Sequence, residues 1–252
     1  MRYAKGSLVI SRERDIPLLR QVRNSKFVSQ SQLFEYSRLG GFDHDKDSFN
    51  WRLRRLRKSA HVGVCSDVSG VGSAVYRVTK KGLALLEHHG EYSTVLNSST
   101  EHLPHSSQVF HALELNEINL ALARRNLLAG WQSEIEVASF NTISRSPYQK
   151  DYDAIVTVWL GDRAARFALE YERSLKKLKQ YERIRLALEA ERELDLILYL
   201  TSGPEVLVPL FQELGSANKK VGFAEAKSFE QSLLETSVIC AGSVSVRLRD
   251  LL

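Results

Sequence analysis

The chain has 252 residues, of which 43% are hydrophobic and 26% are charged. This composition is typical of globular proteins and argues against wholesale disorder. The apolar runs, such as residues 194–200, are too short to cross a bilayer, and the N-terminus lacks the apolar stretch of a secretory leader, so no membrane partner is expected. Cys65 and Cys240 show neither metal spacing nor a disulfide framework, which predicts a reducing, cytoplasmic setting.

The net charge is divided unevenly along the chain. Residues 1–90 hold 17 Lys and Arg against 8 Asp and Glu, a net charge of +9, whereas the remainder holds 18 against 22, a net charge of −4. Such asymmetry predicts a basic module that binds a polyanion, joined to a second module for which the charge predicts no such binding. We therefore expect a nucleic-acid-binding domain over residues 1–90, a polar linker over 91–106 and a second domain over 107–252.

The first module has the apolar periodicity of three helices followed by two strands and a short closing helix. Helices are expected over residues 14–25, from an N-cap at Ser29 to Gly40, over 48–60 and over 83–87. Strands are expected around residues 61–65 and 74–78, separated by the Gly- and Ser-rich loop 66–73. This order predicts a winged helix-turn-helix in which the third helix enters the major groove and the loop is the wing.

The third helix, SFNWRLRRLRKSA, has two distinct faces and a cap at Asp47 or Ser48. At ~100° per residue, Phe49, Leu53 and Leu56 fall on one side. The other side carries an amide, a large aromatic ring and cations: Asn50, Trp51, Arg54, Arg55 and Lys58. That combination suits a helix that reads bases in double-stranded DNA. A solvated basic face is the alternative, and the tryptophan could instead belong to a core or a dimer interface.

Further basic residues of this module are expected to contact phosphates and thereby fix the helix on the duplex. They are Arg52, Arg57, Arg77, Lys80 and Lys81. Affinity for DNA should then fall steeply with salt concentration. No P-loop or dinucleotide-binding glycine motif accompanies them, so no nucleotide or organic cofactor is expected.

The second module alternates helices and strands, which predicts an α/β domain with a mixed sheet. Helices are expected over residues 108–128, 174–193, 204–214 and 229–234. Strands are expected over residues 131–140, 151–160, 165–172 and 194–201, with edge strands at 221–224 and 244–248. The strongly apolar segment 194–201 is expected at the sheet centre. The helix before it should bury Leu175, Leu178, Tyr181 and Leu188.

Two neighbouring strands of this module bring carboxylates together. If Gly161-Asp162 is the whole turn, Asp153 lies opposite Glu170, and with a four-residue loop it lies opposite Glu172. Like charges opposed in a sheet destabilise it by up to ~1 kcal/mol. Mg²⁺ or Mn²⁺ would offset that repulsion, so Asp153 and Glu170 are candidate metal ligands. Alternatively, the acids serve only an interface and pair with Arg166, Lys176 or Lys177.

The order of strand, carboxylate, turn, strand, E-x-K and helix resembles the core of PD-(D/E)XK nucleases. The resemblance implies that Asp153 and Glu170 bind Mg²⁺ and that a lysine two residues after the glutamate positions the attacking water. Glu172 stands in place of that lysine, and Lys176 is the candidate substitute. The implied catalytic set is therefore Asp153, Glu170, Glu172 and Lys176, and the glutamate in place of the lysine favours a retained site geometry with altered or absent hydrolysis.

A second resemblance covers nearly the entire chain. The succession FVSQSQL, WRLRRLRKSAHV, YRVTKKGLALL, HALELNEINLAL, DYDAIVTV and FALEYERSLKKLKQY is similar to the replication-relaxation proteins of plasmids and mobile elements. The resemblance implies a winged helix joined to a degenerate nuclease-like domain, with replication or transfer proteins as partners. We expect a sequence-specific, homodimeric binder of double-stranded DNA, with a Mg²⁺-dependent endonuclease as the alternative.

Overall fold

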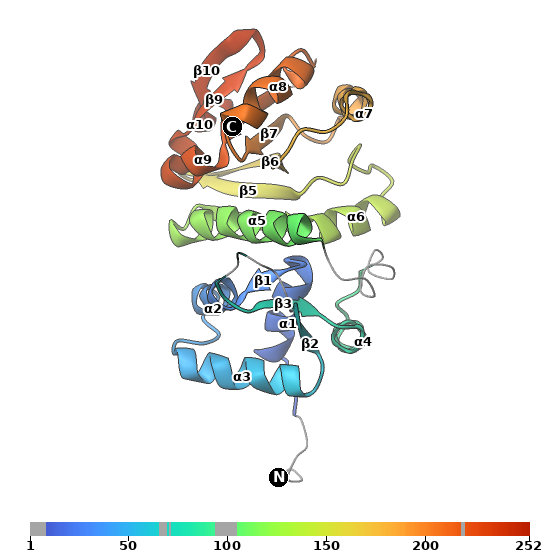
Figure 1. The fold of residues 1–252 in the computed structure, drawn as a ribbon, viewed down its shortest axis with the longest axis vertical. Coiled ribbons are helices and arrows are strands. Elements are labelled where there is room, and N and C mark those ends of the chain that lie inside the picture. Colours follow the sequence, from blue (N-terminus) through green and yellow to red (C-terminus); the bar gives the residue numbers. More distant parts are fainter. Residues whose placement is uncertain (1–8, 66–69, 71, 94–104, 218–219) are drawn as a thin grey trace. The chain divides into compact units, whose positions relative to one another are not determined.

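The computed structural model describes residues 9–65, 70, 72–93, 105–217 and 220–252 (Figure 1). It divides into two compact units, Met1–Asn116 and Glu117–Leu252, and the division falls inside helix α5 (Ser106–Arg124). Residues 66–69 and 71 of the expected wing, and residues 94–104 of the expected linker, lie outside the described part of the chain. Each unit is described by itself below.

Unit 1 is a helical bundle with a small antiparallel sheet of order β1-β3-β2. Its elements are α1 (Asp15–Asn24), β1 (Val28–Ser29), α2 (Gln30–Leu39), α3 (Lys46–Lys58), β2 (Val62–Cys65), β3 (Val75–Val78) and α4 (Lys80–His88). The helices and two of the strands are those expected from the sequence. The two-residue strand β1 was missed, because so short a segment has no readable periodicity.

Side-chain caps explain where the helices of unit 1 begin. Ser29 caps α2 as expected, and its hydroxyl accepts a hydrogen bond from the Gln32 amide. The cap of α3 is Asp45, whose Oδ1 accepts from the Ser48 amide at 2.7 Å, so the expected caps at positions 47 and 48 are wrong. Thr79 caps α4, which therefore begins earlier than residue 83.

Burial of one apolar face fixes α3 in unit 1. Phe49, Leu53 and Leu56 are buried in a core cluster with residues of α1, α2 and the sheet. The predicted inner face of the basic helix is thus confirmed. Helix α4 approaches the sheet closely at Gly82, where an added Cβ would lie 2.2 Å from the carbonyl oxygen of His61.

Unit 2 is a mixed α/β domain with a seven-stranded sheet of order β10-β9-β8-β7-β6-β5-β4. After α5 come β4 (Leu128–Ser133), α6 (Glu134–Ile143), β5 (Ala154–Leu160), β6 (Arg163–Glu172), α7 (Leu178–Ala190), β7 (Leu196–Thr201), α8 (Pro204–Leu214), β8 (Lys220–Glu225), α9 (Ala226–Ser232), β9 (Ser237–Cys240), β10 (Val244–Arg247) and α10 (Leu248–Leu251). The pairs β6–β7 and β7–β8 are parallel and the other neighbours are antiparallel. The mixed sheet and the central place of β7 confirm the expectation.

The expected strand over residues 131–140 is wrong. Strand β4 ends at Ser133 and helix α6 follows directly. The amide and the hydroxyl of Ser133 both donate to Glu136 Oε2, each at 2.8 Å, which is the capping-box spacing at a helix start. The preceding helix ends at Arg124 rather than 128, and β8 is an interior strand because the unpredicted β9 pairs with it.

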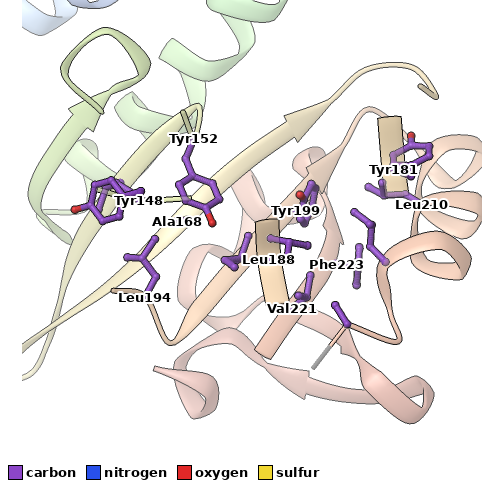
Figure 2. Packing of buried hydrophobic residues seen from close by; sticks show 14 of the residues in the cluster. Tyr148, Tyr152, Ala168, Tyr181, Leu188, Leu194, Tyr199, Leu210, Val221 and Phe223 are labelled. Atoms are coloured by element: carbon purple, nitrogen blue, oxygen red, sulfur yellow. The ribbon is translucent and has the colours of Figure 1, made fainter. Parts of the chain in front are cut away.

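Helix α7 is shorter than expected and buries fewer leucines. It begins at Leu178, not at residue 174, so Lys176 precedes the helix. Leu175 and Leu178 are 48% and 67% exposed, whereas Tyr181 and Leu188 are buried as expected. Figure 2 shows these two with Ala168 and Tyr199 in the core cluster of this unit. No helix in the described part of the chain is long and apolar enough to cross a membrane.

Candidate nucleic-acid interface and acidic cluster

Helix α3 presents a basic face to solvent. Trp51 is 58% exposed, and Arg54, Arg57 and Lys58 are also exposed. Asn50 is half-buried, and its Oδ1 accepts a hydrogen bond from Gln30 Nε2 at 2.8 Å. The NH2 group of Asn50 is consequently the part of the amide that could meet a base edge.

Arg55 joins this exposed face to the interior of unit 1. Its guanidinium forms an ion pair with Asp15 of α1, and its Cζ lies 4.9 Å from the centre of the Trp51 ring. A planar guanidinium over an indole is a favourable cation–π arrangement. Trp51 is therefore held on the outside of the helix, which argues against a place in the core of this unit.

The structure places Arg52 inside the unit, away from the exposed face. The residue is 5% exposed, its Nε and Nη2 donate to the two oxygens of Asp43 at 3.2 and 3.0 Å, and its Nη1 donates to Asp15 at 3.2 Å. Burial lowers the pKa of Arg52, but the bonds and charges of Asp43 and Asp15 outweigh it and raise that pKa. The expected phosphate contact is thus not available to Arg52, which instead ties α3 to its neighbours.

The other expected phosphate contacts lie on the surface of unit 1. Arg77 is half-buried on β3, and Lys80 and Lys81 are exposed in the first turn of α4. The guanidinium of Arg57 lies 5.7 Å from the centre of the Tyr76 ring. Together with α3 these residues supply positive charge from three elements of one unit.

His61, which directly precedes β2, is buried, and its Nδ1 lies 2.7 Å from Ser59 Oγ. Burial and the nearby charge of Lys81 lower the pKa of His61, against a smaller opposite effect of Asp15. The imidazole is therefore held neutral near pH 7.

In unit 2, the β5–β6 hairpin has the first of the two registers considered above. Leu160 pairs with Arg163 around the two-residue turn, and Ala154 pairs with Leu169. One step further along the hairpin, this register sets Asp153 opposite Glu170. Asp153 Oδ2 also accepts a hydrogen bond from the Tyr171 amide at 2.8 Å.

The acids on β6 are buried and each is paired with a lysine. Glu170 and Glu172 are 4% and 5% exposed. Lys150 Nζ lies 2.6 Å from Glu170 Oε2, and Lys176 forms an ion pair with Glu172. Burial raises the pKa of Glu170 and the charge of Asp153 adds to this, while Lys150 and Lys176 act in the opposite direction. We call these five residues, Lys150, Asp153, Glu170, Glu172 and Lys176, the acidic cluster.

Lys150 was missed from the sequence. Its only signal was its position three residues before Asp153, and nothing in the pattern indicated that the intervening turn would bring its ammonium to β6. Lys176, the expected substitute for the missing lysine, lies instead at Glu172, and its own pKa is lowered by burial.

Two buried polar atoms beside the acidic cluster have no hydrogen-bond partner within the described residues: Glu170 Oε1 and Tyr199 Oη. Tyr199 is aligned with Glu170 in the parallel β6–β7 pair and is fully buried. Burial, and then the charge of Glu170, raise the pKa of Tyr199 well above its ordinary value.

The cluster fits a divalent metal only in part. Among the described residues, no group of three or more His, Cys, Asp and Glu side chains is placed to hold an ion. Asp153 and Glu170 could supply two carboxylates, but the ammonium of Lys150 already contacts Glu170. Two lysines thus supply the positive charge that a cation would bring, and a cation there would be repelled by both.

Comparison with protein families gives one finding. The family model described as "Replication-relaxation" matches residues 19–195, from within α1 to just before β7, and therefore spans parts of both units. No curated protein and no solved structure gives a match.

Proposed function

Since this chain belongs to the replication-relaxation family, we propose that it is a sequence-specific binder of double-stranded DNA in a plasmid or mobile element. It acts there as a regulator or accessory factor in replication, transfer or transcription. The observation that carries the proposal is the exposed basic face of α3, with Trp51 held outward by Arg55.

The architecture of unit 1 supports this reading. The order α1, β1, α2, α3, β2, β3 and α4, with a three-stranded antiparallel sheet, supports a winged helix-turn-helix, and we assign α3 as its recognition helix. Base contacts are assigned to Asn50, Trp51, Arg54, Arg55 and Lys58. Phosphate contacts are assigned to Arg57, Arg77, Lys80 and Lys81.

DNA binding is tested with a random duplex library. The protein is incubated with 20-base-pair random duplexes, bound DNA is sequenced, and affinity for the enriched duplex is measured by fluorescence anisotropy at several salt concentrations. Arg54→Ala should lower that affinity by about fivefold or more, because one base contact accounts for about 1–3 kcal/mol. Arg183→Ala, at an exposed position on α7, is the matched control. No enrichment of any duplex would contradict the proposal.

Unit 2 is proposed to be a nuclease-like domain that serves dimerisation or partner contacts rather than hydrolysis. Its antiparallel β4, β5 and β6, followed by the α7 crossover to a parallel β7, support a PD-(D/E)XK-like core. Both acids on β6 are neutralised by lysines, which supports the loss of catalysis. Analytical ultracentrifugation tests the homodimer, and a monomer at all accessible concentrations would count against it.

A Mg²⁺-dependent endonuclease is the second candidate. It is favoured by Oε1 of buried Glu170, which lies close to Asp153 and has no hydrogen-bond partner among the described residues. The test is nicking of supercoiled plasmid with Mg²⁺ or Mn²⁺, comparing the wild type with Asp153→Ala. We expect no metal-dependent nicking. Nicking by the wild type that Asp153→Ala abolishes would instead establish the enzyme.

A further inference from the structure

We propose that Asp15, a buried acid of α1, sets the sequence selectivity of α3 by positioning Arg55 and, through it, Trp51. The inference rests on the DNA-binding role proposed above and adds a residue outside the expected DNA contacts. Asp15 is 0% exposed, so it does not touch DNA itself. It is a positioning residue for two side chains of the exposed face.

The carboxylate of Asp15 is fixed by donors from two directions. Its Oδ1 accepts from Arg52 Nη1 at 3.2 Å. Its Oδ2 accepts from Arg55 Nη2 and from the Ser11 amide, the latter at 2.8 Å. A carboxylate with this many donors has one orientation, and it imposes that orientation on the guanidinium groups it binds.

Arg55 transmits this constraint to the surface. Asp15 holds one end of its guanidinium, and the Trp51 ring covers its face at 4.9 Å. The Arg55 side chain is 25% exposed and Trp51 is 58% exposed. Asp15, Arg55 and Trp51 therefore form a continuous set of contacts from a buried carboxylate to an exposed ring. Arg55 Nε is buried without a hydrogen-bond partner among the described residues, which leaves the Asp15 pair as the polar anchor.

A positioning role and a purely electrostatic role of Asp15 predict opposite changes in the affinity of Asp15→Asn for the preferred duplex. The substitution removes one negative charge from a DNA-binding unit, so electrostatics alone raises affinity for every duplex. If Asp15 positions Arg55, the substitution also frees Arg55 and Trp51, which must then be ordered again when DNA binds. The preferred duplex loses this pre-organised contact, whereas unrelated duplexes do not.

The experiment measures a ratio of affinities. A preferred duplex is selected from the random library with the wild-type protein, and its affinity is compared with that of a shuffled duplex of the same composition. Asp15→Asn should lower the ratio by about fivefold or more, the value of one base contact. The fraction of folded protein cancels from this ratio, so loss of stability alone does not change it.

Two control variants separate charge and stability from positioning. Asp47→Asn removes the same charge from an exposed position in the first turn of α3 and should raise both affinities with the ratio unchanged. Asp43→Asn removes the other partner of Arg52 and should lower thermal stability with the ratio unchanged. A loss of selectivity in Asp43→Asn equal to that in Asp15→Asn would overturn the inference.

A double-mutant cycle tests whether Asp15 acts through Arg55. In an Arg55→Ala background, Asp15→Asn should not lower the ratio further, and an additive loss would overturn the inference. Arg55→Lys keeps the positive charge but lacks the planar group that stacks on Trp51, so it should lower the ratio even if Asp15→Asn does not fold. If the wild type shows no preference among duplexes, both the proposed DNA-binding function and the role of Asp15 are overturned. If the wild type and Asp15→Asn are equally selective, only the role of Asp15 is overturned.

Discussion

Lys150 Nζ and Glu170 Oε2 lie 2.6 Å apart in the acidic cluster, where the Lys150 side chain is 20% exposed and the Glu170 side chain 6%. The ammonium stabilises a carboxylate that burial would otherwise drive toward its protonated form. The pair thus offsets part of the cost of burying an acidic group of β6 in the interior of unit 2.

Lys150→Met should destabilise the protein by about 2 kcal/mol at pH 8, because it leaves a buried carboxylate without its partner. Glu170 already has a raised pKa, and loss of Lys150 raises it further. As pH falls, Glu170 takes up a proton and the cost of the substitution should shrink. Urea denaturation at pH 8 and pH 5 measures the difference, with Lys227→Met, at an exposed position of α9, as the control. A cost independent of pH would contradict the pairing.

Arg52→Ala and Arg54→Ala should affect different properties although the residues are two positions apart: the first should lower stability, and the second should weaken DNA binding. Arg52→Ala leaves Asp43 and Asp15 buried without their shared cation and should cost about 3 kcal/mol or more in the free energy of unfolding. Arg54 is exposed, so Arg54→Ala should change stability by less than about 0.5 kcal/mol while weakening DNA binding. Thermal unfolding measures the stability of each variant, and fluorescence anisotropy on the same samples measures its affinity for DNA. Equal stability of the two variants would argue against a structural role for Arg52.

The lowered pKa of His61 predicts a stability that depends on pH. Since the folded state holds this imidazole neutral, its contribution is fully present above the unfolded pKa of about 6.5 and is lost as pH falls through that value toward the folded pKa. His61→Asn should remove this part of the pH dependence. The measurement is the difference in unfolding free energy between wild type and variant from pH 5 to pH 8. A constant difference over that range would exclude the effect.

Gly82→Ala should destabilise unit 1 by about 1–3 kcal/mol through overpacking. An added Cβ would lie 2.2 Å from the backbone oxygen of His61, which cannot move without disturbing the start of β2. Gly72→Ala is the control, because its Cβ would meet nothing within 4 Å. Circular dichroism melts of the two variants should differ by several degrees, and identical melting would contradict the close approach.

The elements with strong local signals were predictable from the sequence. The two faces of α3, the cap at Ser29, the Gly161-Asp162 turn and the central strand β7 each follow from periodicity or turn chemistry within a few residues. Helix α6 has a local signal as well, the spacing of Ser133 and Glu136, but the alternation of apolar residues over the same segment predicts a strand.

The features that depend on distant residues could not be predicted. Arg52 is buried because Asp15 and Asp43 come from other parts of the fold, and no pattern within α3 distinguishes it from exposed Arg54. Lys150 reaches Glu170 only because the hairpin places the start of β5 beside the end of β6. Asp15 lies 37 positions from Arg52, and Glu170 lies 20 positions from Lys150, so tertiary packing decides both pairings.

The register of the β5–β6 hairpin also has a consequence for the order of folding. A hairpin closed by a two-residue turn forms in microseconds, whereas the parallel pairing of β6 with β7 must wait until the α7 crossover is closed. Asp153 and Glu170 therefore meet early, in water, where repulsion between carboxylates is weak. Their repulsion becomes costly only when β7 pairs with β6 and the acids are buried. The hairpin has by then already brought Lys150 to Glu170, so this ion pair offsets the repulsion at the late step of folding.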